Sequence, residues 1–331
     1  TSFDNSFGFS NAVKTYDLLQ TPDFIAISNE KGGATVWAAG TTYNTDWQKA
    51  TMRDNAQQVT NNLSVSGGSE KGKFYLSLGS TDQEGLAKAN NMKRYTARTN
   101  IDANVTKWLS LGTNIGLTKT EYDGLNTGGT TGNALSGSIY AATKMLPNTP
   151  IYDVNNPTGY NLDLANNRVG QWDNNLPIAN ALPNIVYIMD KNKYSSKITR
   201  ILASAYASAK ITKDLNFKVQ GSIDNSINKG FQYLNPINGD GFSSKGYLYN
   251  DNTEYFRYNW QNILTYNKTF AEKHTVGVTA VSEYQKQKFE TFWGEGRTLL
   301  DEFYNQGLIT NSYTTKDAGG SQSENGIMSY V

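Results

Sequence analysis

The sequence predicts an all-β fold, a transmembrane antiparallel β-barrel, and three observations carry this prediction. Apolar and polar residues alternate over segments of ten or more residues, the pattern of a strand whose two faces meet different surroundings. Short polar links alternate with long ones along the chain. No apolar run approaches the roughly 20 residues that a membrane helix needs, so any crossing of a bilayer must use strands.

The composition agrees with a chain whose strands expose one face to water. Only 37% of its residues are hydrophobic, the mean hydropathy is -0.57, and it has 21 tyrosines and 30 glycines. Lys plus Arg (30) nearly balance Asp plus Glu (29), so the net charge of +1 gives no field that would attract nucleic acid, and none is expected as a partner. The absence of cysteine excludes disulfides, thiolate metal sites and a cysteine nucleophile.

The first strands are predicted from the N-terminus onward. One lies near Phe7 to Phe9, and the next two flank the turn GGSEKG at 67–72, before and after which apolar residues occupy every second position. The apolar positions of this hairpin are Leu63, Val65, Phe74, Leu76 and Leu78. GGSEKGKF at 67–74 is close to a P-loop, but Phe74 replaces the Ser/Thr and a strand follows, so we interpret it as a hairpin turn.

Three more hairpins follow along the chain. Their strands and turns are predicted at 95–105, 106–108 and 109–117, then at about 194–211, 212–214 and 214–226, then at about 256–266, 268–273 and 276–284. Leu202 and Tyr206 interrupt the polar register of their strand, and we expect them to pack against something inside the barrel. Trp108, Tyr266 and Phe270 near tight turns, and Phe289, Phe292 and Trp293 near the far ends, are expected to form interfacial girdles.

The long links should share one rim of the barrel. They are predicted at about 81–91, 119–193, 227–253 and 291–325, whereas the other rim has only tight turns. Outer-membrane barrels have this asymmetry, with short periplasmic turns and long extracellular loops. A soluble β-sandwich or propeller also shows alternation and remains an alternative; it would be extracted without detergent.

Four runs carry a resemblance to a known family: NTDWQ (44–48), NNLSVSGGSEKGKFYLSLGSTDQEG (61–85), KRYTARTNIDANVTKWLSLGTNIGLT (93–118) and NILTYNKTFAEKHTVGV (262–278). They resemble the SusC/RagA family of TonB-dependent outer-membrane transporters of the Bacteroidetes. The resemblance implies a 22-stranded barrel closed by a plug, of which about ten strands are present here. Residues 1–331 are therefore expected to be the N-terminal half of the barrel, with extracellular loops at 119–193, 227–253 and 291–325, within a longer polypeptide that supplies the plug.

The sequence offers no catalytic chemistry. His274 stands alone at the start of a strand. Asp153 and Asp240 could each help to bind Ca²⁺, but neither has the ligand spacing of a known calcium loop, and Asn/Asp/Gly clusters are ordinary turn chemistry. We therefore expect no enzyme activity, no catalytic residue, no cofactor and no metal.

Two groups of residues are candidates for binding. The loop 119–193 carries aromatic rings among amides and carboxylates, which suit stacking on sugars and hydrogen bonding to hydroxyl or peptide groups. Packing of the loop against a neighbouring protein would explain these rings equally well. The predicted solute-binding residues are Tyr140, Tyr152, Tyr160, Trp172 and Asp173, and those predicted to face the plug or the solute path are Arg94, Arg98, Lys218 and Arg257.

The resemblance implies a function in active import across the bacterial outer membrane. A SusD-like lipoprotein would cap the barrel and deliver an oligosaccharide or peptide, and TonB would pull on an N-terminal segment outside this chain. The other partner would be outer-membrane lipid. A surface scaffold or adhesin that binds a partner without transport is the alternative. The sequence does not distinguish a glycan from a peptide as the solute.

Overall fold

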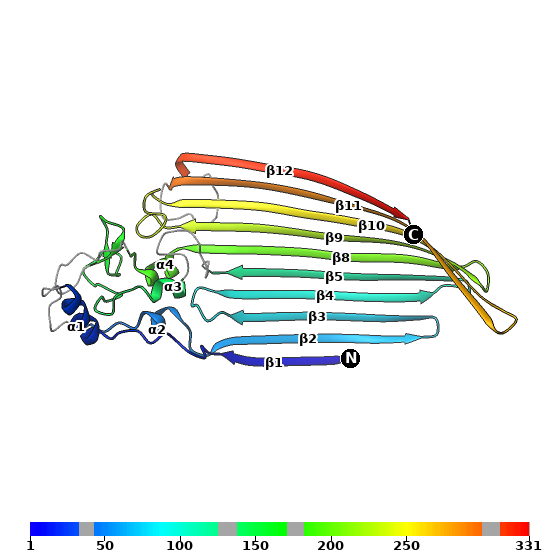
Figure 1. Cartoon of the computed structure of the whole chain (residues 1–331), viewed down its shortest axis with the longest axis horizontal. Coiled ribbons are helices and arrows are strands. Elements are labelled where there is room, and N and C mark those ends of the chain that lie inside the picture. The colour runs from blue at the N-terminus through cyan, green and yellow to red at the C-terminus, as the bar shows by residue number, and fades with distance from the viewer. Residues whose placement is uncertain (33–42, 125–137, 171–181, 300–311, 331) are drawn as a thin grey trace.

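The computed structural model describes residues 1–32, 43–124, 138–170, 182–299 and 312–330. Its main feature is one antiparallel sheet of ten strands, in which each strand pairs with the next long strand along the chain (Figure 1). The strands are β1 (Ser2–Ser10), β2 (Ala56–Ser69), β3 (Gly72–Glu84), β4 (Asn91–Asn104), β5 (Leu109–Asp123), β8 (Lys193–Lys210), β9 (Leu215–Leu234), β10 (Tyr247–Phe270), β11 (His274–Leu299) and β12 (Ser312–Tyr330). The predicted up-and-down order and number of strands are confirmed.

The register of the sheet aligns the alternating pattern from strand to strand. Leu78 of β3 lies opposite Leu63 of β2 and opposite Ala97 of β4, and Ala97 lies opposite Leu117 of β5. Directly opposed residues share one face of a sheet. The apolar positions predicted strand by strand therefore form one continuous surface, which we call the apolar face; the reverse is the polar face.

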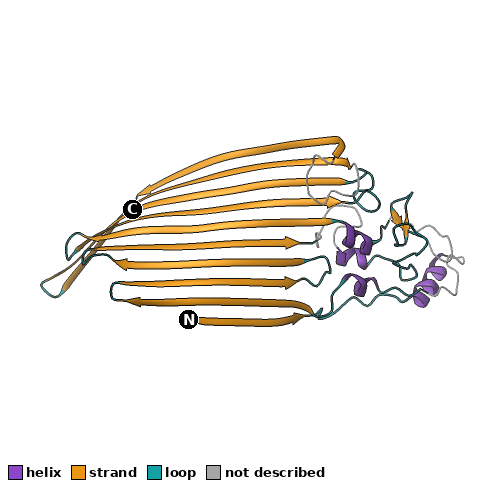
Figure 2. Cartoon of the chain, turned by 180° about the vertical axis from the view of Figure 1, so that it is seen from behind, coloured by secondary structure: helices purple, strands orange, loops and turns teal. Residues whose placement is uncertain are grey.

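The tight turns lie where the sequence predicts them. Ser69 pairs with Gly72, so GGSEKG is a hairpin turn and not a phosphate-binding loop. The other short links are 105–108, 211–214 and 271–273. All of them lie at one end of the sheet, and the helices lie at the other end (Figure 2).

Two of the predicted long loops are much shorter in the structure. β9 continues to Leu234 and β10 begins at Tyr247, so the link is 235–246 and not 227–253. β11 continues to Leu299 and β12 begins at Ser312, so the link is 300–311 and not 291–325. The GIMSY residues (326–330) form the end of β12. The boundaries were wrong because polar and aromatic residues fall on both faces of these strand ends, which removes the contrast that period-two patterning needs.

The link between β5 and β8 is not structureless. It contains the helices α3 (Ser138–Ala142) and α4 (Ile185–Lys191) and the short strands β6 (Leu162–Asp163) and β7 (Arg168–Val169). Two further helices, α1 (Thr21–Gly32) and α2 (Trp47–Thr51), lie in the link between β1 and β2. None of the helices in the described part of the chain is long and apolar enough to span a membrane.

These loop elements share a hydrophobic core, and we call them together the loop unit (α2, α3, α4, β6 and β7). Trp47 of the NTDWQ run is 2% exposed, and its indole N–H donates to the Leu146 carbonyl at 3.0 Å. Asp46 caps α2 by accepting from the Lys49 backbone N–H at 3.0 Å. The core is formed by Trp47, Ala141, Ala142, Met145, Val169, Leu182, Ile185, Val186, Ile188 and Met189.

Buried asparagines tie the loop unit to the sheet. The backbone N–H of Asn184, which caps α4, donates to Asn238 Oδ1 at 2.9 Å, and Asn238 in turn donates to the Arg168 carbonyl. Asn235 donates to Asn192 Oδ1 at 2.7 Å. Because buried amides without partners are costly, these paired contacts fix the loop unit to the link between β9 and β10.

Candidate functional site

The apolar face remains uncovered in the structure. Leu111, Phe217 and Val278 all lie on it and are 41%, 37% and 56% exposed. Soluble monomers rarely expose a contiguous apolar surface of this extent. A bilayer is the surrounding in which such a face is favourable, as the sequence predicts.

The apolar face ends toward the loops in aromatic and then charged residues. On β10 and β11, Tyr258 and Tyr284 pack with ring centroids 5.8 Å apart. Farther toward the loop end, on the same face, Lys288 forms an ion pair with Glu290 at 2.6 Å. Aromatic residues followed by ion pairs mark the interface between hydrocarbon and water.

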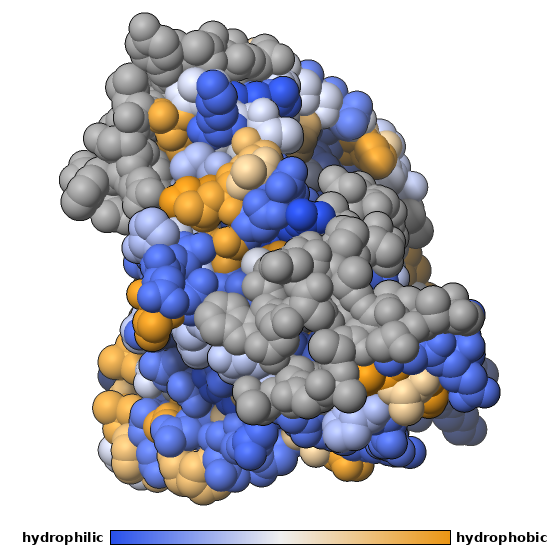
Figure 3. Space-filling view, turned by 90° about the vertical axis from the view of Figure 1, so that its left-hand side faces the viewer, coloured by the Kyte–Doolittle hydropathy of each residue, from blue (hydrophilic) through white to orange (hydrophobic). Residues whose placement is uncertain are grey.

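Part of the predicted aromatic girdle is wrong. Phe292 does lie on the apolar face, 60% exposed. Phe289 and Trp293, one residue out of phase, lie on the polar face, where Phe289 packs on Tyr255 at 4.9 Å and Trp293 stacks on Tyr249 at 6.2 Å. Hydrophilic side chains predominate on the coloured surface of the loop end (Figure 3).

The four predicted interior residues all lie on the polar face. Arg98 and Arg257 belong to one row of opposed residues across the sheet, and Arg94 and Lys218 have the same phase on β4 and β9. Arg257 donates to Gln287 at 2.8 Å. Contact of these cations with a plug or a solute stays a prediction.

Of the two residues that interrupt the polar register, Tyr206 has a structural role. Tyr206 lies across Gly112, where an added Cβ would be 2.2 Å from the ring, and its hydroxyl donates to Asp102 at 2.6 Å. The Lys218 ammonium lies 4.4 Å from the centroid of the same ring. Leu202 lies on the polar face between Gly116 and Asp224 and is 53% exposed. Tyr206 thus packs against the barrel wall itself, on the interior side.

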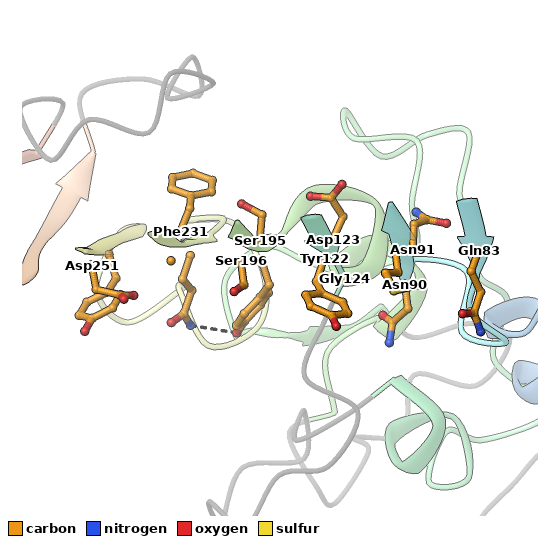
Figure 4. A pocket seen from close by; sticks show the side chains of 16 residues that line it. Gln83, Asn90, Asn91, Tyr122, Asp123, Gly124, Ser195, Ser196, Phe231 and Asp251 are labelled. Carbon is orange, nitrogen blue, oxygen red and sulfur yellow. Dashed lines mark hydrogen bonds between the residues drawn. The ribbon is translucent and has the colours of Figure 1, made fainter. Parts of the chain in front are cut away.

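A groove of about 640 Å³ lies at the loop end of the sheet. We call it the tyrosine groove, because Tyr122, Tyr194 and Tyr249 line it from three strands, each with the phase of the polar face. Gln232 donates to the Tyr194 hydroxyl at 2.9 Å. The sixteen lining residues are drawn in Figure 4, where Asp251, Ser196, Tyr122 and Gln83 point to one side of the sheet.

The backbone of the tyrosine groove is kept open by glycine. A Cβ on Gly230 would lie 1.9 Å from Asp251 Oδ1, so only glycine leaves room for that carboxylate.

The tyrosine groove has the groups that suit a sugar or a peptide. Its aromatic faces can stack on a sugar ring or a peptide plane, and its amides and carboxylates can form hydrogen bonds with the polar groups. In the described part of the chain, no group of three His, Cys, Asp or Glu side chains could hold a metal ion.

The structure brings together two of the predicted loop residues. Tyr152 and Tyr160 form a β-bridge with ring centroids 5.2 Å apart, and Tyr160 also packs on the buried Tyr187 at 5.0 Å. Tyr160 donates to Asp190 at 2.5 Å, and burial together with this bond raises the pKa of its phenol. Tyr152 is 59% exposed.

The other predicted loop residues are not part of this pair. Tyr140 stands on α3, half-exposed, with the Lys144 ammonium 4.2 Å from its ring. Trp172 and Asp173 lie outside the described residues. Burial raises the pKa of Asp240, in the link between β9 and β10, for which no role was expected.

The tyrosine groove was missed by the sequence interpretation. Tyr122 and Tyr249 fall in segments assigned to loops, and Tyr194 falls at the very start of a predicted strand. A search for aromatic residues in the polar phase of each strand, continued beyond the apolar face, would have found all three.

Comparison with known proteins identifies relatives of this chain. It is 26% identical over 302 residues to TonB-dependent receptor P3 of Formosa agariphila, covering 90% of this chain and 28% of that protein. It is 30% identical over 233 residues to TonB-dependent receptor P39 of the same organism, 69% of this chain and 20% of that protein. Over 100 residues it is 35% identical to TonB-dependent receptor SusC of Bacteroides thetaiotaomicron, 30% of this chain and 10% of that protein.

Solved structures share the fold. The RagAB peptide importer in its closed-closed state superposes with a TM-score of 0.74 at 18% identity, covering 99% of this chain and 39% of the other. The open-open state gives 0.73 at 19% identity. No protein-family model matches the chain. This chain covers 28%, 20% and 10% of the three TonB-dependent receptors named above, which is less than a third of the length of each. Together with the apolar face, the matches confirm the resemblance, the barrel fold and the outer-membrane localisation expected from the sequence.

Proposed function

We infer that this chain, similar in sequence to TonB-dependent receptors including SusC and similar in fold to the RagAB peptide importer, forms part of the wall of an outer-membrane transporter. Its cargo is an oligosaccharide or a peptide. The chain contributes the N-terminal half of the barrel, and its loop end faces the outside of the cell.

One observation supports this proposal above the others: the same strands carry an apolar face and, on their reverse, the tyrosine groove. A scaffold in the membrane needs only the first of these surfaces. A solute path needs a polar interior with stacking groups at its mouth, and Tyr122, Tyr194 and Tyr249 supply them at the end where loops gather.

The transport mechanism requires no bond chemistry in this chain. Stacking on the tyrosines and hydrogen bonds to Gln232 and Asp251 would hold successive units of a flexible solute at the mouth of the barrel. The cations Arg94, Arg98 and Arg257 on the polar face would then meet carboxylates of the plug. Energy enters through TonB, which acts on a segment outside this chain.

A SusD-like lipoprotein is the proposed partner at the loop end. The loop unit supports this proposal because its core and its asparagine ties fix exposed side chains such as Tyr152 relative to the sheet. A surface held in place before binding loses less entropy on docking than free loops would.

Uptake measurements test the proposal. A strain lacking the full-length gene should lose uptake of a dye-labelled dextrin mixture or of a dye-labelled casein peptide mixture, and which of them is lost identifies the solute class. If the deletion leaves both uptake rates unchanged while cell-surface binding of a partner falls, the scaffold or adhesin alternative is correct.

Site variants then localise the solute path. Tyr249→Ala should reduce uptake because it removes a stacking face from the groove. Tyr75→Ala is the matched control, since Tyr75 also lies on the polar face and is 37% exposed, but it belongs to the strand end near the tight turns. Equal losses in the two variants at equal barrel levels would remove the groove from the proposal.

A further inference from the structure

A second groove, of about 650 Å³, lies at the loop end of the sheet and includes side chains of the apolar-face phase. Lys197 of β8 and Lys229 of β9 line it and are directly opposed in the register. Figure 4 shows Phe231, Ser195 and Asp123, which line both grooves, pointing away from the side on which Tyr122, Ser196 and Asp251 lie. We propose that this second groove, the lysine groove, binds the phosphate of a lipid headgroup in the outer leaflet.

Both lysines lie beyond the end of the apolar face that is nearer the loops. On β8, Lys197 is four residues from Ile201, about 13 Å along the strand. On β9, Lys229 is two residues from the apolar Ile227, about 7 Å, and six residues from Ile223, where the continuous apolar series ends, about 20 Å. The headgroup region extends about 5–8 Å beyond the hydrocarbon on each side, and lysine stems reach along apolar surfaces to place their charge there.

Neighbouring carboxylates do not neutralise Lys197 and Lys229. Glu121 lies opposite Lys197, but it is already in an ion pair with Lys119 at 2.8 Å. Lys197 is also attracted to Glu121, but within the described residues neither Lys197 nor Lys229 forms an ion pair or a hydrogen bond. Like charges directly opposed across strands repel each other, so an anion between them would relieve the repulsion.

Other charged groups nearby do not cancel the pair. Lys193 also lines the groove, so three lysines share it with the two carboxylates Asp123 and Asp251, and Asn252 lies opposite Lys229. The remaining lysines on the outward-facing ends of the strands differ in this respect. Lys93 pairs with Asp82, Lys286 with Glu324 and Lys288 with Glu290.

The walls of the groove indicate a lipid as the source of the phosphate. Phe231 and Phe292 line it beside the lysines, and Phe292 is 60% exposed. A phosphate attached to an apolar body satisfies both the cations and the rings, whereas free phosphate leaves the rings in water. The groove also opens next to the face that meets the hydrocarbon.

Lipid binding to the full-length protein tests the proposal. Wild type and Lys197→Gln/Lys229→Gln would be placed in phosphatidylcholine nanodiscs and titrated with dioleoyl phosphatidic acid, with bound lipid counted by native mass spectrometry. Each lysine near an anionic headgroup contributes about fivefold in affinity, so the double variant should bind about thirtyfold more weakly. Lys286→Gln/Lys288→Gln removes the same charge on the same face, but from lysines already in ion pairs, and should bind like wild type.

Three results would overturn the proposal: unchanged binding in the first variant, an equal loss in the control, or displacement of the lipid by inorganic phosphate, which would make this a site for a free anion. Both variants are checked for an unchanged unfolding midpoint by circular dichroism. Solute uptake should be unaffected by Lys197→Gln/Lys229→Gln, so failure of this proposal and failure of the transport proposal are separate outcomes.

Discussion

The assignment of the two faces can be tested at a single pair of neighbouring residues. Val219 lies on the apolar face, in the middle of the series Leu215, Phe217, Val219, Gly221 and Ile223. Gln220 lies on the polar face, opposite Tyr206 and Gln261. Replacing each of them by arginine adds the same charge and nearly the same volume at almost the same depth.

The loss of stability expected for Val219→Arg follows from the position of Val219 in the membrane. Four residues separate it from each end of the series, about 13 Å along the strand or about 10 Å of depth in a tilted barrel. The charge of Val219→Arg would thus lie near the middle of an apolar band about 25 Å tall, where arginine facing lipid costs about 2–4 kcal/mol. Gln220→Arg faces water or polar side chains, and we expect a cost below about 1 kcal/mol.

Urea unfolding of the full-length protein in lipid vesicles measures both costs. Val219→Ala is the reference for the loss of the valine side chain, and the free energy of unfolding is compared among the variants. If Gln220→Arg destabilised the protein as much as Val219→Arg, or if Val219→Arg were as stable as Val219→Ala, the apolar face would not meet lipid. The transport proposal would then fail with it.

Three further predictions concern the loop unit and the polar face. Trp47→Ala should cost about 3–5 kcal/mol of local stability, because it empties the core of the loop unit. Trypsin should then cleave faster within 138–192, while the unfolding midpoint of the barrel stays unchanged. Equal cleavage rates in the variant and wild type would contradict this prediction. Gly112→Ala should destabilise wild type by about 1–3 kcal/mol but have little effect in a Tyr206→Ala background, because the added Cβ clashes with that ring and with the Asp102 oxygen to which the Tyr206 hydroxyl donates. Additive effects in urea unfolding would show that the two residues do not interact. Tyr160 should ionise after exposed tyrosines in an ultraviolet titration, because its pKa is raised above the ordinary 10. Its contribution to the free energy of unfolding is complete below pH 10 and is lost as the pH rises toward the pKa of the folded state. Tyr160→Phe should remove this pH dependence.

Much of the sheet could be predicted because two solvents act on it. Between Leu109 and Leu117, lipid on one side and water on the other force a change of polarity at every residue, and the strand is evident from that contrast alone. From Thr253 of β10 toward the loops, polar residues fall on both faces, so the pattern contains no period, and the last seven residues of the strand (247–253) were assigned to a loop. The limit was physical: a strand in a uniform solvent leaves little trace in one sequence.

The loop unit was missed for a different reason. Its core joins Trp47 of α2 to Ile185 and Met189 of α4, segments more than 130 residues apart. Its helices are five to seven residues long, too short to show a 3.6-residue period. Trp47 was noticed only as part of a family-like run, and nothing local to NTDWQ indicates that its indole is buried against a carbonyl a hundred residues away. Asn238, one of the asparagines that fix the unit, lies in the Asn/Asp/Gly cluster of Asp240 that was interpreted as turn chemistry.

The register contains one more piece of evidence for a barrel wall in a membrane, and it is independent of the relatives. Consider the row of opposed residues that begins at Leu63: it is apolar at Leu78, Ala97, Leu117 and Ile201, then passes through Asn225 and Phe256 to Lys288 and Glu324. A flat sheet standing upright in a bilayer would keep such a row at one depth and of one polarity. In this sheet the row leaves the hydrocarbon, and on β11 the apolar residues Val276 and Val278 lie much nearer the tight turn. The apolar band therefore crosses the hydrogen-bonded rows obliquely, as it must when strands tilt by 35–45° around a barrel axis. The same tilt places Lys229 farther out than Asp82 and Lys93, which share its row, so the depth of the proposed lipid site and the barrel geometry depend on one measurable quantity, the strand tilt in the membrane.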